Sequence, residues 1–151
     1  MRLFRPLCAM LLLVAALTVT SCEKPAPLPQ EQNSMAVSYD VIAGAWQLSH
    51  WQGAELAEGT HLYIDLDIEQ RYTMWDNIDS MYSRKTTGSY NITQEEDGSY
   101  TLSGTYDNGV GKWSNTYSIK LIGDGTHMQW ASREGNQTMD FIYVGNIPEL
   151  Y

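Results

Sequence analysis

The sequence predicts an all-β fold, an eight-stranded up-and-down antiparallel barrel, with an eight-stranded β-sandwich as the alternative. From Ile42 onward, apolar and polar residues alternate with a period of two, which is typical of strands with one buried face. Turn signals rich in Gly, Asn and Asp interrupt this alternation at short intervals, and no window shows the spacing of an amphipathic helix. Sequential strands with short connections usually pair with their neighbours, and closing such a sheet gives a barrel.

The first four expected strands are defined by the residues that share a face and by the breaks between them. They are residues 45–51, 61–67, 71–75 and 85–93. The side chains expected on the apolar face are, strand by strand, Trp46, Leu48 and His50; Leu62, Ile64 and Leu66; Tyr72 and Met74; and Gly88, Tyr90 and Ile92. Trp51 and Trp75 fall on the opposite, outward face of their strands.

The last four expected strands are separated by hairpin signals at Asp97-Gly98, Asn108-Gly109 and Gly123-Asp124-Gly125. They are residues 100–106, 114–122, 128–132 and 138–144. Their expected inward side chains are Leu102, Gly104 and Tyr106; Tyr117, Ile119 and Leu121; Trp130; and Phe141 and Tyr143. The opposite faces are polar, so they are expected to meet water rather than the lipid that surrounds a membrane-spanning barrel.

The first 21 residues predict a lipoprotein signal peptide. Arg2 and Arg5 precede an apolar run of a length that fits secretion and is too short for a permanent membrane span. Small residues then lead to Cys22, as in the lipobox of bacterial lipoproteins, where the cysteine is lipidated. We therefore expect lipid anchoring in the bacterial envelope, at the outer membrane, with residues 22–40 as a lipidated, Pro-rich tether and residues 41–151 as the barrel domain.

Composition excludes several other classes of function. The net charge of −9 argues against a nucleic-acid partner, because phosphate binding needs a basic face. Both cysteines, Cys8 and Cys22, lie in the signal and lipidation segment, so the domain has no thiolate metal site, disulfide or cysteine nucleophile. The three histidines are scattered and no nucleophile motif is present, so we expect no enzyme, no metal and no cofactor.

The start of the first strand resembles a known family. Gly44-Ala45-Trp46 is similar to the Gly-x-Trp motif of lipocalins, and the stretch from about Ile42 to Val144 resembles the short lipocalin-like, calycin-type domain of bacterial lipoproteins. The segments 62–66 and 102–106 support this resemblance. It implies a calycin-like barrel, and we expect Gly44 and Trp46 to be structural, with Trp46 at the closed end.

Tryptophans gather at the end of the barrel that has the longer loops. In an up-and-down barrel, the connections 52–60, 76–84, 107–113 and 133–137 share one end, which we call the long-loop end. The connections 68–70, 94–99 and 123–127 share the other, the short-loop end. The candidate ligand-binding residues at the long-loop end are Trp51, Trp75, Tyr82, Trp113 and Trp130.

Two interpretations of these aromatic residues remain open. In the first, they surround a pocket that sequesters or carries a small apolar or aromatic ligand. In the second, bulky side chains fill the barrel, as eight strands allow. Four of the candidates, Trp51, Trp75, Tyr82 and Trp113, would then form an exposed patch that docks an envelope protein or inhibits an enzyme. Trp75 and Trp113 are expected to be half-exposed and to contribute little to stability.

Overall fold

The computed structural model describes residues 35–150 as one short helix and nine strands. In chain order these are α1 (Tyr39–Ile42), β1 (Gly44–Trp51), β2 (Ala54–Glu55), β3 (Leu62–Leu66), β4 (Arg71–Asp76), β5 (Arg84–Gln94), β6 (Tyr100–Tyr106), β7 (Tyr117–Ile122), β8 (His127–Ser132) and β9 (Thr138–Tyr143). The predicted signal peptide, Cys22 and most of the predicted tether lie outside the described residues.

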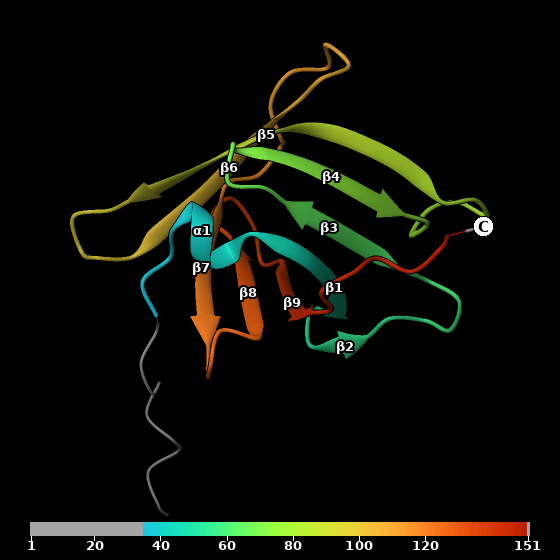
Figure 1. The fold of residues 1–151 in the computed structure, drawn as a ribbon, viewed down its shortest axis with the longest axis horizontal. Coiled ribbons are helices and arrows are strands. Elements are labelled where there is room, and N and C mark those ends of the chain that lie inside the picture. Colours follow the sequence, from blue (N-terminus) through green and yellow to red (C-terminus); the bar gives the residue numbers. More distant parts are fainter. Residues whose placement is uncertain (1–34, 151) are drawn as a thin grey trace, which may run out of the picture. The chain divides into compact units, whose positions relative to one another are not determined.

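The strands close into an eight-stranded antiparallel barrel (Figure 1). Each of β3 to β8 pairs with the next strand in the chain, β1 pairs with β3, and β1 also pairs with β9 through Trp46 and Tyr143. This last pairing closes the sheet and excludes the sandwich alternative. The predicted barrel is therefore confirmed, with β2 as one extra strand that pairs with the end of β1.

The predicted alternation holds along most of the barrel wall. Most of the largest fully buried side chains come from the expected inward positions, among them Trp46, Tyr72 and Phe141, and Ile42 and Met128 belong to the same continuous core. Tyr143 differs, because it is 47 % exposed. It lies at the short-loop end, with its ring edge-on to that of Trp46 at a centroid distance of 5.3 Å.

A β-bulge in β1 reverses the predicted orientation of two side chains. Leu48 pairs with Phe141, but the next pair along the strand is His50 with Asp140, so Ser49 is an additional residue. The Ser49 hydroxyl donates to the backbone oxygen of Asp140 at 2.8 Å. His50, expected inside, therefore shares the outer face with Asp140. Trp51, expected outside, pairs with Met139 and packs against the core.

The segment before β1 packs against the barrel. Met35 forms a bridge with Leu121, and Val37 and Ile42 are buried in the core. The Tyr39 hydroxyl donates to Asn91 Oδ1 at 3.1 Å and accepts from the Ile92 backbone N–H at 3.0 Å. Residues 35–40, expected to belong to the tether, are thus packed as part of the folded domain.

Candidate functional site

The long-loop end holds an apolar cavity inside the barrel wall. Its volume is about 170 Å³. It lies where β3 and β9 begin, where β4 and β6 end, and beside the connection between β6 and β7 (Figure 1). The lining residues are Leu62, Ile64, Met74, Tyr106, Trp113, Ser114, Tyr117, Trp130, Met139 and Phe141.

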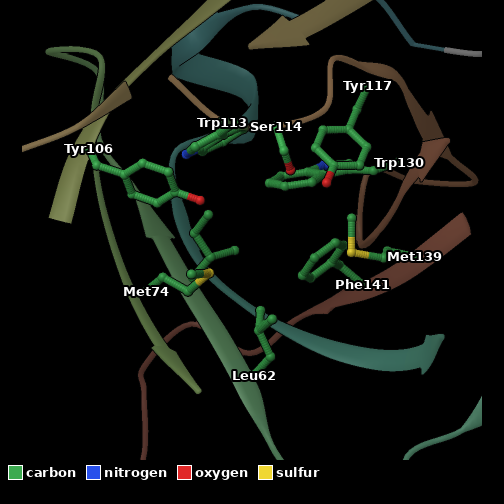
Figure 2. Close-up of a pocket in the computed structure, with 10 residues that line it drawn as sticks. Leu62, Met74, Tyr106, Trp113, Ser114, Tyr117, Trp130, Met139 and Phe141 are labelled. Atoms are coloured by element: carbon green, nitrogen blue, oxygen red, sulfur yellow. The ribbon is translucent and has the colours of Figure 1, made fainter. Parts of the chain in front are cut away.

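The cavity has two chemically different walls. Figure 2 shows the polar atoms of Ser114, Tyr117 and Trp130 on the same side, next to the Trp113 ring. The opposite side is formed by Leu62 and Met74 and also carries the Tyr106 hydroxyl, whereas Phe141 lies beside Trp130. Nothing in the lining carries a formal charge at neutral pH, so the cavity suits an uncharged molecule.

Aromatic rings pack on one another around this cavity. The rings of Trp113 and Trp130 are stacked, with centroids 5.9 Å apart and an interplanar angle of 29°. Trp130 also contacts Phe141 at 4.8 Å, and Trp113 contacts Tyr72 edge-on at 5.2 Å. The Trp113 Nε1–H donates to the Tyr72 hydroxyl at 3.0 Å. These contacts hold both indoles in fixed positions on the cavity wall.

Trp113 reaches the interior because its loop folds back onto β6. Thr105 bridges Lys112, and the Trp113 backbone N–H donates to the Gly104 oxygen at 2.8 Å. A methyl group on Gly104 would collide with the Trp113 ring. The glycine thus creates the space that this ring occupies. Trp113 is half-buried, as expected, and its ring joins the aromatic cluster. The contact between Trp113 and Gly104 also explains why β7 begins at Tyr117 rather than at the predicted residue 114.

Two of the five predicted ligand-binding residues, Trp113 and Trp130, line the cavity. Trp51 packs against the core through Met139 but is not part of the lining. Trp75 lies on the outer face as predicted, with the Lys85 ammonium 5.6 Å from its ring centroid. Tyr82 is 77 % exposed in the connection between β4 and β5. The structure therefore does not bring the five together.

The other eight lining residues, among them Met74, Met139 and Ser114, were not predicted to belong to the site. Met74 and Met139 share strand faces with Tyr72 and Phe141, so the period-two pattern contained this information. Ser114 had no such signal, because it lies in a loop and reaches the cavity only through the position of Trp113.

The rim of the cavity carries one buried carboxylate. Asp76, at the end of β4, accepts a hydrogen bond from the Arg84 guanidinium at 2.6 Å, and this ion pair holds the pKa of Arg84 above its usual range. Burial raises the pKa of the Tyr106 phenol, and the neighbouring Tyr117 and Asp76 add to the shift. Tyr106 is therefore neutral at physiological pH.

Comparison with protein-family models, with curated proteins and with solved structures gives no match. Among residues 35–150, no group of three His, Cys, Asp or Glu side chains is close enough together to hold a metal ion. Within the same range, no helix is long and apolar enough to cross a membrane.

Proposed function

We propose that this protein is a lipid-anchored, lipocalin-like envelope protein that binds a small apolar or aromatic molecule at the long-loop end. The observation that carries the proposal is the uncharged, aromatic-lined cavity inside an otherwise well-packed barrel. Ring-shaped ligands gain both apolar contact and aromatic packing there.

The size of the cavity limits the ligand to about one ring. A volume of about 170 Å³ is close to the engineered apolar cavity of about 150 Å³ that binds benzene. Pockets for drug-sized ligands span roughly 300–1,000 Å³. The proposed ligand is therefore a single-ring molecule rather than a fatty acid or a fused polycycle.

Binding of a simple probe tests this function. We suggest titrating the ¹⁵N-labelled domain with toluene and following the five indole N–H signals by NMR. Trp113 and Trp130 line the cavity and should shift, whereas Trp46 at the short-loop end and Trp75 on the outer face should not. Unchanged Trp113 and Trp130 signals at saturating toluene would contradict the proposal. Native mass spectrometry of protein purified from its own host would then reveal the natural ligand.

The anchoring part of the proposal depends on the lipobox that ends at Cys22. Each buried methylene of an acyl chain contributes about 0.8 kcal/mol, so several chains hold a protein firmly to a membrane. Cys22→Ser should therefore move the protein from the membrane fraction to the soluble fraction. A mutant that remains with membranes while its signal is processed normally would contradict lipid anchoring.

A second candidate function is protein docking, which the exposed tip of the β4–β5 connection favours. Met81 is 92 % exposed and lies next to the exposed Tyr82. Two of the four residues of the patch expected from the sequence, Trp51 and Trp113, are not free for this role, because they pack against the core. Trp75 lies on the outer face and stays available. The same native mass spectra separate the two functions, because a docking module would carry a protein partner and no small molecule.

A further inference from the structure

We infer that the ligand presents an uncharged hydrogen-bond acceptor to the indole N–H of Trp130, which makes the preferred ligands single-ring compounds with a carbonyl or ether oxygen. This inference rests on the proposed function. Trp130 is 4 % exposed, and its Nε1–H has no hydrogen-bond partner among the described residues. Buried donors are nearly always paired, because an unpaired donor loses its hydrogen bonds to water and gains nothing.

Two other tryptophans of the barrel have partners for their indole N–H groups. The buried Trp46 donates its Nε1–H to the Ile42 oxygen at 2.9 Å, and Trp113 donates to the Tyr72 hydroxyl at 3.0 Å. Other groups of the folded protein therefore accept the indole N–H hydrogen bonds of Trp46 and Trp113. Trp130 lines the cavity, so a bound molecule that comes within hydrogen-bond distance of this buried N–H would provide the missing partner.

The surroundings of Trp130 define the chemistry of the acceptor. Figure 2 shows the Ser114 and Tyr117 oxygens on the same side of the cavity as the Trp130 indole. A ring placed against Leu62 and Met74 on the other side can direct an oxygen substituent toward the Trp130 indole. A carboxylate would lose its hydration without meeting a cation in the lining, so a neutral acceptor is favoured.

Two probes of nearly equal shape isolate the hydrogen bond. Acetophenone has a carbonyl oxygen where α-methylstyrene has a methylene group, and both have one ring. The quantity to measure is the ratio of the dissociation constants of the two probes, determined for the wild type and for each variant. Comparing this ratio between proteins cancels the difference in hydrophobicity between the two probes. Trp130→Phe removes the N–H and keeps an aromatic ring. It should reduce the preference for acetophenone by about tenfold, which is typical of one hydrogen bond to a buried donor.

Trp113→Phe is the matched control. It also removes an indole from the cavity wall, but the N–H that is lost already has Tyr72 as its partner. It should weaken both probes to a similar extent and leave the ratio within about twofold of the wild type. Thermal unfolding of both variants establishes that they are folded.

NMR of the wild-type protein provides a measurement that needs no variant. Acetophenone should move the Trp130 Nε1 proton downfield, as a new hydrogen bond does, and α-methylstyrene should not. If both probes bind and the ratio is the same in the wild type and Trp130→Phe, the acceptor inference is wrong and the cavity function stands. If neither probe binds the wild type, the proposed function is wrong, and this inference with it.

Discussion

The indole of Trp113 lies directly against the backbone of Gly104. The two residues are also joined by a backbone hydrogen bond of 2.8 Å, so the loop after β6 is fixed to β6 itself. This single contact places Trp113 over Tyr72 and beside Trp130. Trp113 forms one wall of the cavity. The absence of a side chain at Gly104 therefore determines part of the shape of the candidate site.

Gly104→Ala should therefore destabilise the domain and displace Trp113. An added methyl group has no free space here, and overpacking a core typically costs about 1–3 kcal/mol. Urea unfolding measures the loss, and the Trp113 indole signal should shift. The control is Gly135→Ala, where a methyl group would meet only Ser132 Oγ at an ordinary 3.7 Å. Equal stability of the two variants would show that the Trp113–Gly104 contact is not tight in solution.

The sequence was sufficient to predict the barrel and its strands because period-two alternation records which face is buried. It placed Tyr106, Tyr117, Trp130 and Phe141 inside correctly for the same reason. It failed at Ser49, because an inserted residue leaves the local pattern intact while reversing the orientation of His50 and Trp51. No property of these three residues alone distinguishes a bulge from a regular strand.

The presence of the cavity could not be predicted from the alternation of apolar and polar residues. Whether ten inward side chains fill a barrel depends on their summed volumes and rotamers, and an eight-stranded barrel is close to that limit. The contact of Trp113 with Gly104 could not be predicted, because residues 107–116 have no periodicity and the position of Trp113 depends on a contact with a different strand. Gly104 faces inward as expected, and the ring of Trp113 occupies the space beside it.

Trp46 and Trp75 should differ sharply in their contribution to stability. Trp46 is 1 % exposed, packs edge-on to Tyr143 and donates a hydrogen bond, so Trp46→Ala should cost about 3–5 kcal/mol. Trp75 lies on the outer face beside Lys85, so Trp75→Ala should cost less than about 1.5 kcal/mol. Thermal and urea unfolding of the pair measure the difference. Similar losses in both variants would mean that the register of β4 is wrong.

The free energy of unfolding should fall as the pH rises above about 10, the ordinary pKa of tyrosine. Tyr90 is buried and donates its hydroxyl to the Asp67 oxygen at 2.6 Å. Burial, with the nearby Asp67 and Tyr39, raises its pKa well above the usual range. The folded state therefore keeps the proton while the unfolded chain releases it. The stabilisation is fully present below pH 10 or so and is progressively lost above it.

Tyr90→Phe tests this mechanism. The variant loses one hydrogen bond and about 1 kcal/mol at neutral pH, but it has one fewer group to ionise. Its unfolding free energy should decline less steeply between roughly pH 10 and 11. Some decline remains, because burial also raises the pKa of Tyr72 and Tyr106. Parallel pH profiles for the wild type and the variant would show that Tyr90 does not contribute.

Ser114→Trp should close the cavity without disturbing the core. Ser114 is exposed and lines the cavity immediately after Trp113, so a large ring there can occupy the ligand volume from the loop side. We expect toluene affinity to fall by at least about tenfold, while surface substitutions of this kind usually change stability by about 0.5 kcal/mol. Glu96→Trp is the control, because Glu96 is exposed in the β5–β6 connection at the short-loop end. If Ser114→Trp binds toluene as the wild type does, the probe occupies another part of the molecule. The outer groove around His50, Ile122 and Ile142 would be the next place to examine.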